Sequence, residues 1–227
     1  MNLPIKLIIA GLVPVAVTSC MMLTNAIPIE NLPEPIKGEM VRLRHDQDNM
    51  VKHFCSSSMK MNLAYISIFK GCGMEKEAQQ LKVNYSALQQ ASSASEKTKF
   101  VKRGNTLIKE GQNTMTKSSH CVVVSKVMFQ NGFRQKDEAY IDLTKVSAEA
   151  IIQAVVAVKT FQQTQNPLQK AVCVAGLDPL IVVMMDVPVM MDNERKFNDQ
   201  TAEIGIKYSC PLPKTEYKTP PAMKMTF

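Results

Sequence analysis

The chain has 227 residues, of which 45% are hydrophobic and 21% charged, and its formal net charge is +7. This is enough chain for one domain or two small ones, with a core that needs no disulfide to hold it together. Three histidines are a thin supply for acid–base or metal chemistry, and the sequence contains no glycine-rich phosphate loop, nucleophile elbow or paired CxxC motif. The positive charge suits anionic lipid headgroups or polysaccharide at least as well as nucleic acid.

The first twenty residues have the layout of a bacterial secretory signal. Lys6 supplies a positive charge, and the apolar run from Leu7 to Val17 is about eleven residues long, too short to span a bilayer. The next segment, Val17-Thr18-Ser19-Cys20, resembles the lipobox of bacterial lipoproteins. The resemblance implies that residues 1–19 are a signal peptide, that cleavage precedes Cys20, and that the Cys20 thiol carries diacylglycerol.

Two alternatives to lipidation stay open. Thr24-Asn25-Ala26 is a small-x-small site, so cleavage after Ala26 would release a soluble secreted effector. An uncleaved anchor over Leu7 to Leu23 is disfavoured by Pro14 and by the polar residues near its end. If Cys20 is lipidated, the residue that follows it is Met21 rather than aspartate, which implies sorting to the outer membrane, facing the periplasm.

A proline-containing segment, residues 20–37, is expected to form an extended lipidated tether. Helical spacing of four and three then begins, and it predicts a helix that ends at Gly71-Cys72-Gly73. The same spacing from Met74 to Leu88 predicts a second helix, antiparallel to the first. The seam of the first helix consists of Leu43, Gln47, Met50, Phe54, Ser57, Met61, Ala64 and Ile68.

Ser93 and Glu96 form a capping box that starts another helix. Its stripe contains Gly104 and Gly111, which would let a neighbouring helix approach closely. The valine-rich segment from Cys121 to Phe129 is either a strand or a buried helical turn, and Asn131-Gly132 is expected to close it.

From Asp137 to Gln163 we expect a long helix, with Ala150 to Val158 at the centre of the core because this stretch is apolar nearly all round. Leu168 to Met191 is apolar but holds two aspartates and two prolines, which favour a broken, buried helix over a membrane span. Asn193 to Tyr208 is the last expected helix. The prediction is an all-α bundle of about five or six helices over residues 38–210, followed by a disordered tail, 211–227.

Five cysteines lie beyond Cys20, and an exported protein meets an oxidising compartment. We predict a bridge between Cys173 and Cys210, which flank the last helical hairpin. A bridge between Cys55 and Cys72 is disfavoured, because a continuous helix would hold them about 20–25 Å apart. Spacing alone leaves the other pairings open.

Three patterns carry weak chemical signals. His45 and His53 are eight residues apart, which does not match the spacing of a metal pair on a helix, so a solvated face is the simpler interpretation. His120 adjoins Cys121, but neighbouring side chains point apart. The duplicated Met-Met-Asp at 184–186 and 190–192 offers soft thioethers, although methionine commonly fills irregular cores. We therefore expect no catalytic residue, metal or cofactor.

The expected function is a non-catalytic interaction or scaffolding role in the bacterial cell envelope, like that of small helical bacterial lipoproteins. Membrane lipid through the acyl anchor and envelope proteins are the expected partners, nucleic acid is not, and the oligomeric state is left open. The alternative is a periplasmic binding module for an apolar or lipid ligand. Its pocket would be lined by Ile151, Val155, Val158, Leu180 and Met184.

Overall fold

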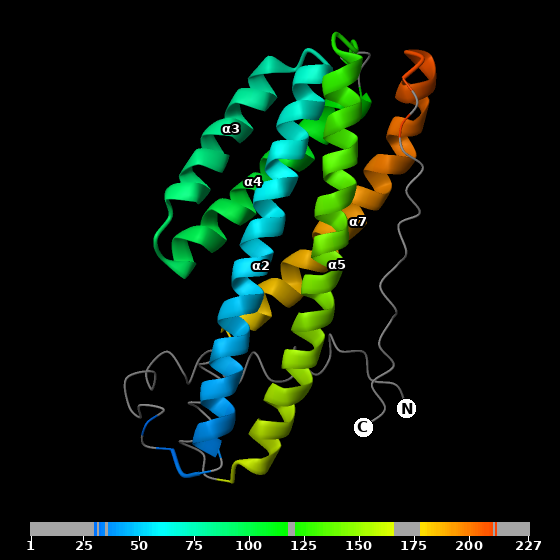
Figure 1. Cartoon of the computed structure of the whole chain (residues 1–227). Helices are drawn as coiled ribbons and strands as arrows, with labels where there is room; N and C mark the ends of the chain where they lie inside the picture. The colour runs from blue at the N-terminus through cyan, green and yellow to red at the C-terminus, as the bar shows by residue number, and fades with distance from the viewer. Residues whose placement is uncertain are drawn as a thin grey trace. The chain divides into compact units, whose positions relative to one another are not determined.

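A computed structural model describes residues 30, 32–34, 36–117, 121–165, 178–210 and 212, and in these ranges every regular element is an α-helix. The all-α prediction is therefore confirmed for this part of the chain (Figure 1). The expected tether lies mostly, and the expected tail almost wholly, outside the described residues. The helices are α2 (Ile36–Gly71), α3 (Glu75–Gln90), α4 (Ala94–Lys117), α5 (Lys126–Gln163) and α7 (Asp178–Lys207).

The described residues fall into two compact units, and the long helices contribute to both. Among the described residues, unit 1 contains those up to residue 50 together with residues 149–165 and 178–182, and unit 2 contains residues 51–117, 121–148, 183–210 and 212. In unit 1 the start of α2 buries Met40, Leu43, Gln47 and Met50 at helical spacing. The end of α5 buries Ala150, Ala157 and Thr160.

The predicted seam of α2 is confirmed along its whole length, because all eight residues from Leu43 to Ile68 are at most 2% exposed. The helix ends where predicted, and Gly73 takes a φ of +69° in the turn that follows. Gly71 is required for a different reason: a Cβ there would lie 2.6 Å from the backbone nitrogen of Phe129. Its carbonyl accepts hydrogen bonds from the backbone N–H groups of Val124 and Ser125, so the turn also fixes the segment before α5.

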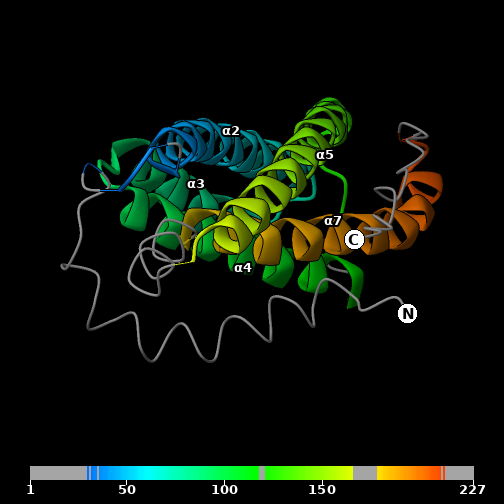
Figure 2. The same cartoon turned by 90° about the horizontal axis from the view of Figure 1, so that it is seen from below.

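Helices α3 and α4 form a hairpin, and both views show them side by side (Figures 1 and 2). The predicted capping box starts α4: the Glu96 N–H donates to Ser93 Oγ at 3.2 Å, and the Ser93 N–H donates to Glu96 Oε2 at 3.3 Å. In α3, Ala78, Leu81 and Leu88 are buried as expected. Asn84 joins the two helices by donating to the Phe100 carbonyl at 3.0 Å.

The glycines of α4 let α2 approach closely, as predicted. A Cβ at Gly111 would lie 2.2 Å from Cζ of Phe69 in α2. A Cβ at Gly104 would meet the side-chain amides of Asn62 in α2 and Asn84 in α3, at 2.8 and 2.9 Å. Glycine costs helix stability, and here that cost is offset by room for the aromatic ring and the two amides.

The expected helix boundaries in the second half of the chain were wrong in two places. Residues 121–125 are non-helical, but α5 begins at Lys126 and runs through Asn131-Gly132 without a break. Gly132 fits there because it faces α2, where a Cβ would lie 2.8 Å from the Ala64 carbonyl oxygen. The two predicted last helices are one helix, α7, with Pro188 inside it.

The stretch from Ala150 to Val158 is not the centre of a core. Ala150 and Ala157 are buried, but Ile152 is 58% exposed and Val155 is 42% exposed. A helix that is apolar all round was expected to be enclosed, yet only one side of this one is covered. No helix in the described ranges combines the length and apolar character needed to cross a membrane.

Candidate functional site

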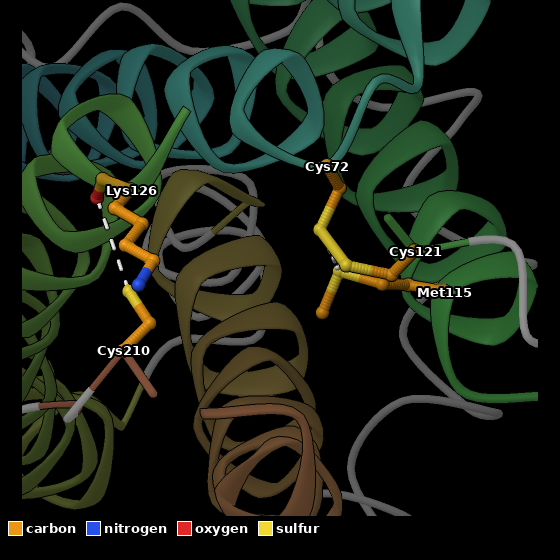
Figure 3. Close-up of a disulfide and its surroundings, with 5 residues drawn as sticks. All are labelled: Cys72, Met115, Cys121, Lys126 and Cys210. Atoms are coloured by element: carbon orange, nitrogen blue, oxygen red, sulfur yellow. Dashed lines mark hydrogen bonds between the residues drawn. A yellow bond between two sulfur atoms is a disulfide. The ribbon is translucent and has the colours of Figure 1, made fainter. Parts of the chain in front are cut away.

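The predicted lipidation site, Cys20, and the predicted bridging residue Cys173 lie outside the described residues, as does His120. Cys72, directly after α2, forms a disulfide with Cys121, just before α5 (Figure 3). The thioether sulfur of Met115, on α4, lies 3.5 Å from the sulfur of Cys72. This bridge closes a loop around the whole α3–α4 hairpin.

Cys210 carries a free thiol in the structure. Its predicted partner, Cys173, lies outside the described residues, so the Cys173–Cys210 bridge stays a prediction. The sulfur of Cys210 lies 4.0 Å from the Lys126 carbonyl oxygen in unit 2 (Figure 3). Cys55 is also a free, buried thiol, consistent with its predicted separation from Cys72. Burial raises the pKa of both thiols, although Lys97 opposes the shift at Cys55 and Lys126 opposes it at Cys210. Both shifts favour the protonated thiol over the nucleophilic thiolate.

The main constellation of ionisable side chains in the described part of unit 2 is a buried polar network. Lys136 of α5 is 0% exposed and Glu194 of α7 is 3% exposed. The Lys136 amine donates to Asn198 Oδ1 at 2.5 Å and lies 3.8 Å from Glu194 Oε2. Asp137 provides a second carboxylate 3.4 Å from the amine.

Two other helices supply hydrogen bonds to the Glu194 carboxylate. The Tyr65 hydroxyl, from α2, donates to Glu194 Oε2 at 2.6 Å. The Gln112 amide, from α4, donates to Glu194 Oε1 at 3.2 Å and to the Tyr65 hydroxyl oxygen at 2.5 Å. Side chains from three helices, α2, α4 and α5, therefore converge on one carboxylate of α7.

Aromatic rings enclose this network. The Tyr65 ring lies 5.5 Å from the rings of Phe69 and Phe197, and Phe133 stacks on Phe197 at 5.9 Å between centroids. The Lys136 amine sits 5.3 Å from the centroid of the Phe133 ring. Such an apolar surrounding strengthens each polar contact and makes an unmatched charge costly.

Burial perturbs both members of the ion pair. It raises the pKa of Glu194, an effect that Lys136 and the hydrogen bonds from Tyr65 and Gln112 oppose. It lowers the pKa of Lys136, which Glu194 and Asp137 oppose. Both groups are shut off from solvent, and their contacts join α2, α4, α5 and α7.

Sequence reasoning missed this network, although a signal was present. Phe129, Phe133, Lys136, Tyr140 and Leu143 are spaced by four and three, so Lys136 occupies a core position of α5. The sequence analysis assigned no role to Lys136, and lysine is rarely buried without a partner. Its partner, Glu194, is 58 positions away and has no sequence feature that marks it.

The predicted pocket residues have mixed environments. Leu180 is 3% exposed, Val155 is 42% exposed, and Ile151, Val158 and Met184 are partly buried. A ligand cavity lined by them stays a prediction. His45 is exposed, with its Nε2 3.2 Å from the Asn49 amide, as a solvated face predicts. Across the described ranges, no three His, Cys, Asp or Glu side chains are grouped to hold a metal ion.

Comparison with known proteins found no matching family model, curated protein or solved structure.

Proposed function

We propose that this chain is an exported protein of the bacterial cell envelope, anchored by lipid on Cys20, with a non-catalytic interaction or scaffolding role. The observation that carries the proposal is Val17-Thr18-Ser19-Cys20 directly after an apolar run of signal-peptide length. The Cys72–Cys121 disulfide supports export, because structural disulfides persist in oxidising compartments and are rare in the cytosol.

Lipid attachment provides a stable anchor if two or more acyl chains are present. A single chain binds membranes marginally, and each buried methylene contributes about 0.8 kcal/mol. Met21 after Cys20 favours the outer membrane, with the helical part in the periplasm. Envelope proteins are then the natural partners.

The buried network supports a structural rather than catalytic role for unit 2. Lys136 and Glu194 are the most strongly desolvated ionisable groups described there, and they bind α2, α4, α5 and α7 to one another. A helical body held rigid in this way is suited to presenting surfaces to partners. The alternatives are a carrier of apolar ligand and, with cleavage after Ala26, a released effector.

The proposal is tested by metabolic labelling with palmitate in a bacterial host, followed by separation of membrane and soluble fractions. The parent chain is expected to carry label and to remain with the membrane. Cys20→Ser should abolish the label, while Cys55→Ser, a matched change at a buried thiol, should keep it. An unlabelled parent chain, or label that survives Cys20→Ser, would contradict the proposal.

A further inference from the structure

Helix α4 has a basic exposed side. The helix contains six basic residues and two acidic ones. At 100° per residue, the positions 99, 102, 103, 106, 109, 110 and 113 fall on one side of the helix, about a third of its circumference. All seven are exposed. We call this side the basic face of α4; its cations are Lys99, Lys102, Arg103 and Lys109.

Within the part of the chain that the structure describes, few negative charges offset these cations. Glu110 shares the basic face, but Glu96, near its edge, is engaged by the N–H groups of Ser92 and Ser93 in the helix cap. Lys102 lies 4.0 Å from Asp186 of α7, and its side chain still has 56% of its surface exposed. The four cations span about 15 Å along the helix, so the charge is spread along a line and not gathered at a point.

The opposite side of α4 explains why the basic face points outward. Val101, Gly104, Ile108 and Gly111 are buried, with the two glycines against α2. Packing on α2 and α3 therefore fixes the rotation of α4, and the cations are held on the outer side. An ordered, extended row of cations fits a surface that carries many diffuse negative charges.

We propose that the basic face of α4 docks unit 2 on the anionic headgroups of a phospholipid membrane. A row of charges without a common focus suits a lipid surface better than a single bound phosphate. The inference rests on the proposed membrane location, but not on acylation of Cys20. Each cation near an anionic surface contributes roughly fivefold in partitioning, and less as salt is raised.

The test uses the full chain carrying Cys20→Ser, so that no acyl chain contributes. Cosedimentation compares phosphatidylcholine vesicles with vesicles that also contain about one-third phosphatidylglycerol, at low and physiological salt. The N-terminal apolar segment is the same in every variant. The ratio of the partition coefficient on anionic vesicles to that on phosphatidylcholine vesicles therefore isolates the charge-dependent part of membrane binding. The basic-face variant carries Lys99→Gln, Lys102→Gln, Arg103→Gln and Lys109→Gln.

A matched control removes four exposed cations elsewhere and lowers the net charge equally: Lys52→Gln, Arg134→Gln, Lys159→Gln and Lys207→Gln. The basic-face variant should lose about ten- to several-hundred-fold of its preference for anionic vesicles, and the control should lose much less. Glu110→Gln, on the same face, should strengthen the preference severalfold, which keeps the test informative if the fourfold variant folds poorly by circular dichroism.

Three results would overturn the proposal. The parent chain could show no preference for anionic vesicles, or the two fourfold variants could lose that preference equally. The third is that the basic-face variant binds soluble anionic polysaccharide more weakly but binds vesicles as the parent does. Palmitate labelling of Cys20 is measured separately, so failure of lipid docking and failure of the proposed anchor are distinguishable.

Discussion

Replacing Lys136 with methionine tests the buried network at its centre. Methionine keeps most of the length of the side chain, being one heavy atom shorter, but removes the amine that lies 3.8 Å from Glu194. Removing one partner of a buried ion pair typically costs 3–5 kcal/mol, because a charge is left uncompensated. Glu194 keeps its hydrogen bonds from Tyr65 and Gln112. We therefore expect the low end of that range, a loss of about 3 kcal/mol in the free energy of unfolding at neutral pH.

The loss should depend on pH in a defined direction. Burial already raises the pKa of Glu194, and without the Lys136 amine that pKa rises further. A carboxyl whose pKa is higher in the folded state than in the unfolded state binds more protons when folded, so stability falls as pH rises through the folded pKa. Acidification from neutral pH should therefore reduce the deficit of Lys136→Met relative to the parent.

Urea unfolding followed by circular dichroism measures both effects. Lys145→Met is the matched control on the same helix: Lys145 is exposed and pairs with Asp142 at 3.2 Å, so the change should cost under about 1 kcal/mol. Adding Glu194→Gln to Lys136→Met should recover part of the loss, because it removes the uncompensated charge. A loss below about 1 kcal/mol for Lys136→Met, with no dependence on pH, would refute the reasoning.

Three further predictions concern packing, the disulfide and the helix cap. Gly111→Ala places a Cβ 2.2 Å from the Phe69 ring and should lower the free energy of unfolding by about 1–3 kcal/mol, despite the better helix propensity of alanine. The control Gly38→Ala, whose new Cβ has its nearest atom at 3.5 Å, should be neutral or slightly stabilising. Equal effects of the two changes in urea unfolding would contradict this. Replacing Cys72 and Cys121 together by serine should lower the free energy of unfolding by about 4 kcal/mol, since the bridge links residues 49 positions apart in the sequence. Non-reducing peptide mapping of the parent should find these two cysteines linked, and another linkage would disprove the pairing. Ser93→Ala removes the acceptor for the Glu96 N–H and should lower the free energy of unfolding by about 1 kcal/mol. The cap hydrogen bonds lower the pKa of Glu96, so the stabilisation from its carboxylate is present at neutral pH and is lost as pH falls through the folded pKa. A stability difference between Ser93→Ala and the parent that stays near zero at neutral pH would argue against the cap.

The first half of the fold could be predicted because local patterns and packing agree there. In α2 a spacing of four and three continues from Leu43 to Ile68, and each of these positions is buried. The Ser93–Glu96 box and the glycines of α4 are likewise local signals with one structural meaning. Helix start, helix end and close approach followed from short stretches of sequence.

The second half was predicted less well because its structure depends on distant partners. Asn131-Gly132 predicts a turn, yet Gly132 lies inside α5. A glycine stands there because the backbone of α2 passes too close for a Cβ. Ala150 to Val158 reads as core, but burial depends on what covers each side of a helix, and Ile152 stays exposed. The pairing of Cys72 with Cys121 and of Lys136 with Glu194 required knowledge of the fold, since spacing does not determine which distant residues meet.

The most direct measurement of the proposed anchor is mass spectrometry of the N-terminal peptide and the intact protein, purified from membranes of its own host. Lipid anchoring predicts a chain that begins at Cys20 and carries the mass of a diacylglyceryl or triacyl group. An unmodified N-terminus at Ile27 would contradict it, and would assign the protein to the secreted class instead.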